Sequence, residues 1–202
     1  AIRHAGSTDE CVGDVPLWAG RLREYAVSRA SARITRIATY EETYATWYAR
    51  EELRGLEAPL RQYFDETAPF ESAEELDDAT VLVTLLAGSV ARNMIDLTRV
   101  EVGSWQRRIH VLVKERLANT QGPTERSRLL ATAGFAALCP HVDDDDAVLE
   151  LDHALNYWKD LLAGVHKAPL FALDDFARRM SRMAPMMDDH PEYDAFVQQL
   201  DR

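Results

Sequence analysis

The sequence predicts an all-α protein, either an irregular multi-helix bundle or a short α-solenoid, of about seven to eight helices. Apolar residues recur at helical spacing along the chain, whereas alternating strand patterns and Asn-Gly or Asp-Gly hairpin turns are absent. Hydrophobic residues make up 47% of the 202 residues, which is enough to build a core. We expect a flexible leader at 1–14 and one helical domain at 15–202. The alternative is a subdivision into a long-helix bundle at 15–119 and an acidic helical half at 123–202.

The first long helix is predicted to begin after Asp14, a capping residue, with Pro16 in its first turn. Its expected buried stripe continues without a break past residue 30: Leu17, Trp18, Leu22, Tyr25, Ala26, Ala30, Ile34 and Ile37. Thr39–Glu42 is either a new capping box or part of one helix that reaches about residue 53. Gly55 and Pro59 interrupt the pattern, and a short segment follows at 60–66.

The remaining helices are predicted from caps and breakers. Ser72-Ala-Glu-Glu75 is a capping box that opens a helix with an apolar, central body at 79–90. Gly103-Ser104 is expected to start the next helix, which ends near Asn119. Gly122-Pro123 starts another, which Pro140 stops. The last three helices are expected at 144–163, 173–183 and 191–201.

The charge of the chain is acidic and uneven. The formal net charge is −11, divided as −1 over residues 1–60, −2 over 61–140 and −8 over 141–202. Nucleic acid binding requires a basic surface that displaces counterions from phosphates, so this balance disfavours nucleic acid as a partner.

The sequence also limits the location of the protein. The longest apolar run, residues 80–91, has 12 residues, against the roughly 20 that a membrane span needs. Cys11 and Cys139 are too few for a disulfide framework, which favours a reducing compartment. We therefore expect a cytoplasmic protein that does not cross a membrane. Because the chain begins at Ala1, we also expect it to be part of a larger protein.

Four consecutive aspartates, Asp143–Asp146, precede a Glu150-x-x-His153 pair. Acids near a helix N-terminus are favoured by exposed N–H groups, so the aspartates need no metal to explain them. Glu-x-x-His is also an element of di-iron bundles, but a second pair is absent. Helical geometry places His153 roughly 150° and Glu150 roughly 90° from the apolar stripe, facing water or the rim. No metal site is therefore predicted here.

A second acidic segment gives an alternative function. Glu75-Leu-Asp-Asp78 ahead of an apolar helix resembles the second motif of the all-α MazG-type nucleotide pyrophosphohydrolases. The resemblance implies a Mg²⁺-dependent nucleoside triphosphate pyrophosphohydrolase with carboxylates around the ion. The family's preceding Glu-x-x-Glu motif is absent, because Arg54 and Gly55 follow Glu51 and Glu52 at the required spacing. The candidate metal ligands are Glu71, Glu74, Glu75 and Asp78.

The leading hypothesis is a non-enzymatic helical module for protein–protein interaction or regulation. Arg29, Arg33 and Arg36 have the spacing i, i+4 and i+7 and are expected to share one face of the first helix. Arginine pairs well with carboxylates, so the face would suit a protein partner with an acidic surface. Tyr44 and Trp47 offer further contact area. No cofactor is predicted under this hypothesis.

Overall fold

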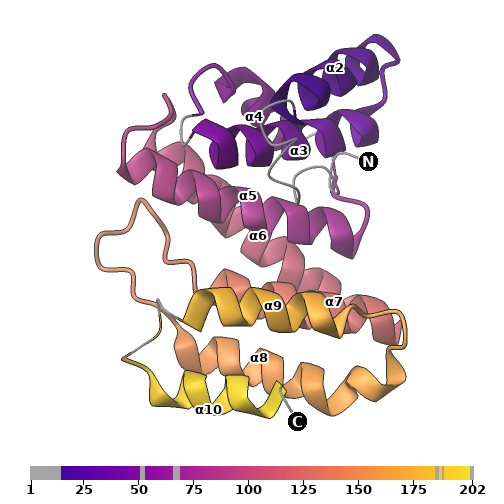
Figure 1. The fold of residues 1–202 in the computed structure, drawn as a ribbon, viewed down its shortest axis with the longest axis vertical. Coiled ribbons are helices and arrows are strands. Elements are labelled where there is room, and N and C mark those ends of the chain that lie inside the picture. Colours follow the sequence, from indigo (N-terminus) through magenta and orange to yellow (C-terminus); the bar gives the residue numbers. More distant parts are fainter. Residues whose placement is uncertain (1–14, 51–52, 66–68, 185–186, 188, 201–202) are drawn as a thin grey trace. The chain divides into compact units, whose positions relative to one another are not determined.

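The computed structural model describes residues 15–50, 53–65, 69–184, 187 and 189–200 (Figure 1). Within these residues all regular structure is helical, which confirms the predicted class. The helices are α2 (Val15–Ser28), α3 (Ala32–Arg50), α4 (Glu57–Tyr63), α5 (Ala73–Ala91), α6 (Arg99–Asn119), α7 (Pro123–Ala137), α8 (Leu151–Gly164), α9 (Leu173–Met183) and α10 (Pro191–Leu200), with a 3₁₀ turn, η1, at Val165–Lys167. The leader expected at 1–14, with Cys11, lies outside the described residues.

The chain divides into two compact units. Unit 1 contains α2 to α5, the part of α6 that ends at Ile109, and the loop His141–Ala147. Unit 2 contains the rest of α6 from His110, then α7, and the chain from Val148 through α8, α9 and α10. The division therefore falls inside one helix, and a loop from later in the sequence completes unit 1.

Helix α2 ends at Ser28, although the apolar spacing continues beyond it. Ala30 has a left-handed φ of 52°. The Ser31 N–H donates to the Ala26 carbonyl at 3.2 Å, and the Ala30 N–H donates to the Val27 carbonyl at 3.0 Å. These two bonds form a Schellman motif, which glycine usually signals. The expected unbroken helix is therefore wrong, because alanine takes the conformation that glycine normally supplies. Helix α3 runs through Thr39–Glu42, so that segment is not a helix start.

Small residues make the contact of α2 with α3, its neighbour in Figure 1. Ala19 and Ala26 are fully buried. A Cβ atom added to Gly20 would lie 3.0 Å from a carboxylate oxygen of Glu42 in α3, so there the α2 backbone lies close to the neighbouring helix. Three large side chains of the expected buried stripe are instead more than half exposed: Leu17, Trp18 and Tyr25. That part of the prediction is wrong, because a close contact through small residues leaves large ones on the outer side.

Helix α5 begins with the predicted capping box. The Ser72 hydroxyl accepts a hydrogen bond from the Glu75 N–H at 3.1 Å, and the Glu75 carboxylate accepts one from the Glu71 N–H at 2.7 Å. The body that was expected to be apolar and central contains the fully buried Leu82 and Leu86. Both features confirm the prediction, because the cap and the apolar positions are set by local sequence.

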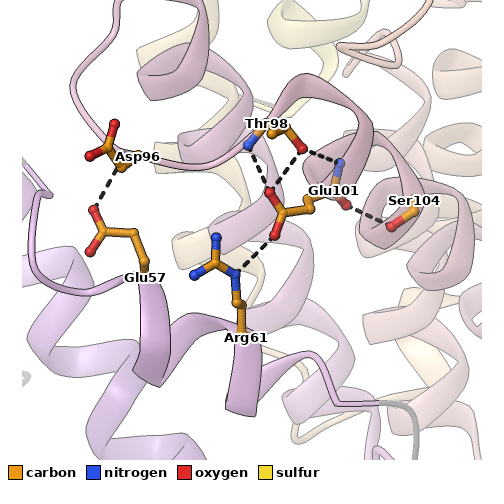
Figure 2. A network of polar contacts seen from close by, with 6 residues as sticks. All are labelled: Glu57, Arg61, Asp96, Thr98, Glu101 and Ser104. Atoms are coloured by element: carbon orange, nitrogen blue, oxygen red, sulfur yellow. Dashed lines mark hydrogen bonds and ion pairs between the residues drawn. The ribbon is translucent and has the colours of Figure 1, made fainter.

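Helix α6 begins at Arg99, before the start expected at Gly103-Ser104. Figure 2 shows why: the Thr98 hydroxyl accepts a hydrogen bond from the Glu101 N–H at 3.1 Å. One Glu101 carboxylate oxygen accepts the Thr98 N–H at 2.9 Å, and Arg61 of α4 donates to the other at 2.9 Å. Thr98-x-x-Glu101 is a capping box that fixes the start of the helix. The expected start is therefore wrong, whereas the predicted end at Asn119 is confirmed.

The four aspartates lie in a loop, and α8 begins only at Leu151 instead of near residue 144. The Arg107 guanidinium donates two hydrogen bonds to the Asp143 carboxylate, each of 2.8 Å, and thereby lowers the pKa of Asp143. Arg99 donates to Asp145 at 2.6 Å. A Cβ atom added to Gly103 would lie 2.0 Å from an Asp143 oxygen, so this glycine admits the loop. The expected helix start is wrong because arginines of α6, not helix N–H groups, hold these acids.

Trp158 of α8 lies at the centre of the unit 2 core and is fully buried. Its indole N–H donates to the Ala131 carbonyl of α7 at 3.2 Å, and α7 and α8 lie side by side in Figure 1. A Cβ atom added to Gly134 would lie 2.1 Å from the indole nitrogen. The surrounding rings are Phe135, Phe176, Tyr193 and Phe196. The predicted start of α7 and the helices expected at 173–183 and 191–201 are confirmed to within one residue.

Candidate functional site

The three arginines expected on one exposed face lie in three different environments. Arg29 is in the turn after α2, and Arg33 and Arg36 are in the first turns of α3. The Arg33 side chain is 64% exposed, with its Nε atom 3.8 Å from a Glu75 carboxylate oxygen. The Arg36 side chain is only 8% exposed, and its terminal nitrogen lies 3.2 Å from the other Glu75 oxygen. One helix face shared by all three is therefore wrong, because α2 ends before Arg29 and Arg36 is buried. Arg33 and Arg36 do lie on one side of α3, since both approach the Glu75 carboxylate.

Glu75 is the centre of a buried ion pair between α3 and α5. The Arg36 guanidinium that pairs with it also lies over the Phe70 ring, 5.1 Å from the ring centroid. The other candidate metal ligands are dispersed: Glu71 and Glu74 are exposed and Asp78 is half-buried. Across the part of the chain that the structure describes, no group of three or more His, Cys, Asp or Glu residues is placed to hold a metal ion. The cations near Glu75 are the guanidinium groups of Arg36 and, at a longer distance, Arg33.

The outer side of α2 carries an exposed surface that the sequence reasoning missed. It consists of Trp18, Arg21, Tyr25 and Arg29, which we call the α2 face. The Arg21 guanidinium lies 5.5 Å from the Trp18 ring, and the Arg29 guanidinium lies 5.3 Å from the Tyr25 ring. Trp18 is 58% and Tyr25 53% exposed. The signal is present in the sequence as the spacing i, i+3, i+7 and i+11, which places all four on one side of a helix.

Tyr44 and Trp47, the two aromatic residues expected to bind a partner, belong to a ladder of rings on α3. Tyr40, Tyr44 and Tyr48 stack in sequence, with 6.1 Å between successive ring centroids. Trp47 meets the edge of Tyr48 at 6.2 Å. Tyr44 and Trp47 are both half-buried, and Tyr48 is the most exposed of the four. Much of their area is therefore already used within the molecule.

Unit 2 contains a small cavity of about 40 Å³ with a mixed polar and apolar lining. His110 and Lys114 of α6 line it together with Glu150, His153 and Tyr157 at the start of α8. His153 Nδ1 lies 2.9 Å from a Glu150 oxygen, and this hydrogen bond is the main cause that lowers the pKa of Glu150. Both side chains are more than half exposed, as helical geometry predicts. A volume of this size holds a few water molecules, so the cavity defines no ligand site.

Comparison of the chain with protein-family models, with curated proteins and with solved structures found no match in any of the three. Among the described residues, no helix is both long and apolar enough to cross a membrane.

Proposed function

We propose that the chain is a non-enzymatic module that binds an acidic protein partner through the α2 face. The observation that carries this proposal is the pair of exposed arginine–aromatic contacts, Arg21 with Trp18 and Arg29 with Tyr25. Trp, Tyr and Arg are the residue types that contribute most binding energy in protein interfaces. Stacking on a ring also orders each guanidinium before the partner arrives, which lowers the entropy cost of binding.

Charge and shape define the expected partner. Arg21 and Arg29 are the exposed cations of the α2 face, whereas Arg23 and Arg36 pair with acids inside the molecule, so the partner surface that meets the α2 face should be acidic. The exposed rings of Trp18 and Tyr25 require apolar contact to be buried favourably. The partner is therefore expected to combine carboxylates with apolar side chains. With a net charge of −11, nucleic acid is not the proposed ligand, and the low cysteine content supports a cytoplasmic location for the proposed interaction.

The test measures fluorescence anisotropy of two labelled peptides of about 15 residues, or four helical turns. One peptide combines Glu with Leu on one face, and the other replaces each Leu by Ser at the same charge. We expect the full chain to bind the Glu–Leu peptide more tightly. Changing Arg21→Glu with Arg29→Glu should weaken binding at least about tenfold, because charge reversal opposes a matched interface. Trp18→Ala with Tyr25→Ala should cause a similar loss.

The matched control is Arg178→Glu with Arg182→Glu, which changes the net charge equally on exposed residues of α9. This control should bind within about twofold of the unchanged chain. An equal loss in the control would remove the α2 face from consideration. If the Glu–Ser peptide binds as tightly as the Glu–Leu peptide, the rings have no role in binding. If duplex DNA binds more tightly than the Glu–Leu peptide, the partner is a nucleic acid and not an acidic protein.

A further inference from the structure

A cavity of about 150 Å³, lined by polar groups and by a larger share of apolar side-chain surface, lies in unit 1 between the start of α3 and the end of α4. It is separate from the α2 face and from the aromatic ladder. Four residues of α3 form one wall, and the spacing i, i+3, i+4 and i+7 places them on one side of the helix. The lining residues are Ala32, Thr35, Arg36, Thr39, Gln62, Tyr63 and Asp65.

The wall of this cavity contains hydrogen-bonding groups that are themselves buried. Thr39 is 2% and Tyr63 is 3% exposed. Burial raises the pKa of Tyr63 well above its ordinary value, so the phenol keeps its proton and can both donate and accept. The Thr35 hydroxyl donates to the Ser31 carbonyl at 2.8 Å, which leaves its oxygen able to accept. Gln62 and Asp65 are exposed, so the cavity opens to solvent on their side.

The charges around the cavity oppose a charged ligand of either sign. Arg36 already has the Glu75 carboxylate at 3.2 Å, so its charge is compensated. A small anion would lie close to both Asp65 and the acids near Tyr63, which include Glu75 and Asp78. A small cation would meet the Arg36 guanidinium instead. The buried hydroxyl groups of the wall disfavour a wholly apolar ligand, because they would lose water without gaining partners. The apolar surface beside them favours a ligand whose hydroxyl groups are carried on carbon atoms.

We propose that this cavity is a binding site for a small, neutral, hydroxyl-bearing molecule about the size of glycerol. A cavity of about 150 Å³ accommodates one benzene ring when its walls are apolar, which sets the ligand at about six heavy atoms. Hydroxyl groups both donate and accept, so they match the mixed wall of Thr35, Thr39, Gln62 and Tyr63. The ligand would replace water molecules that a polar cavity of this volume otherwise holds.

The experiment titrates the full chain, labelled with ¹³C in its threonine methyl groups, and follows the Thr39 signal by NMR. The probes are glycerol, 1-propanol, acetate and ethylammonium. Glycerol should give a saturable shift with a Kd of about 1–10 mM, typical for so few atoms. Thr39→Val keeps the side-chain shape and removes the hydroxyl, so it should weaken glycerol binding by about three- to tenfold, read from the Tyr63 ring signals.

Thr84→Val is the matched control, because Thr84 lies exposed on α5 and does not line the cavity. It should leave the glycerol affinity unchanged. Tyr63→Phe should weaken glycerol binding while keeping the fold, and it provides a second reading if Thr39→Val unfolds the chain. The proposal is overturned if the glycerol shift rises linearly without saturation, which means that water alone occupies the cavity. The proposal is also overturned if acetate, ethylammonium or 1-propanol binds more tightly than glycerol. It is likewise overturned if Thr39→Val and Tyr63→Phe both bind glycerol as tightly as the unchanged chain does.

Discussion

At the scale of single residues, the Arg36–Glu75 pair shows how two charges are accommodated in the interior. Glu75 accepts from Arg36 and from the Glu71 N–H, and its own N–H is capped by Ser72. Arg36 in turn lies over the Phe70 ring. The ion pair, the Glu71 N–H and the Phe70 ring offset part of the desolvation that burial requires, although one Glu75 carboxylate oxygen is buried without a hydrogen bond. Glu75 therefore both takes part in the cap at the start of α5 and anchors α3 against α5.

Replacing Arg36 by Met should lower the free energy of unfolding by about 3 kcal/mol, because it leaves a buried carboxylate without its charge partner. Arg33→Met is the control, since the Arg33 side chain is 64% exposed and lies farther from the same carboxylate. That change should cost less than about 1 kcal/mol. Urea unfolding followed by circular dichroism measures both. Equal losses from the two variants would contradict a special role for the buried pair.

At the scale of the helices, capping interactions set where each helix begins and ends. Some of these caps follow a recognisable sequence pattern, and others do not. The Thr98–Glu101 box and the Ser72–Glu75 box both follow the sequence pattern of a capping box. The start of α6 after Thr98 could therefore have been predicted in place of the start at Gly103-Ser104. The Schellman turn at Ala30 has no such pattern, because alanine normally continues a helix. Where α2 ends matters for the proposed function, since Arg29 lies beside Tyr25 at this end and α3 starts in a new register after it.

The α6 cap should make stability depend on pH. The hydrogen bond from Arg61 is the main cause that lowers the pKa of Glu101 from 4.5 to about 2. Because the folded pKa lies below the unfolded one, the stabilisation is complete above pH 4.5 and is lost as the pH falls toward 2. After screening by solvent, we expect a loss of about 1 kcal/mol. Urea unfolding at pH 5, 4 and 3 measures it.

Glu101→Gln should remove this part of the pH dependence, because the amide does not titrate in this range. Glu115→Gln, an exposed acid farther along the same helix, should leave the profile unchanged. If Glu101→Gln follows the same pH profile as the unchanged chain, the cap is not the source of the acid sensitivity.

At the scale of the whole molecule, two compact units share α6. Unit 2 has its own core around Trp158, built from α7, α8, α9 and α10. The proposed interaction surface and the proposed ligand cavity both belong to unit 1. The α2 face is exposed, whereas the cavity has buried walls at Thr39 and Tyr63 and opens to solvent at Gln62 and Asp65.

A change in the unit 2 core should therefore act mainly on unit 2. Gly134→Ala places a methyl group 2.1 Å from the Trp158 indole nitrogen, so overpacking should cost about 1–3 kcal/mol. Hydrogen exchange should show faster exchange in α7 and α8 and little change in α2 and α3. Gly164→Ala is the control, because nothing lies within 4 Å of the added carbon. Equal loss of protection in both units would mean that the chain opens as one cooperative unit.

The sequence by itself determined the helical class, the caps at Ser72 and Gly122, the helices at 173–183 and 191–201, and the outward position of Glu150 and His153. These features depend on neighbours within one or two turns, which periodicity and capping chemistry describe.

Only the tertiary structure decided which side of α2 is buried, that Arg36 meets Glu75, and that Asp143 and Asp145 meet arginines of α6. It also brought α3 and α4 together around the cavity lined by Thr35, Thr39 and Tyr63. The reason is physical: an arginine or a tryptophan is compatible with either side of a helix. Its environment is set by how closely the neighbouring backbone approaches and which charge that neighbour carries, and a one-dimensional pattern contains neither quantity.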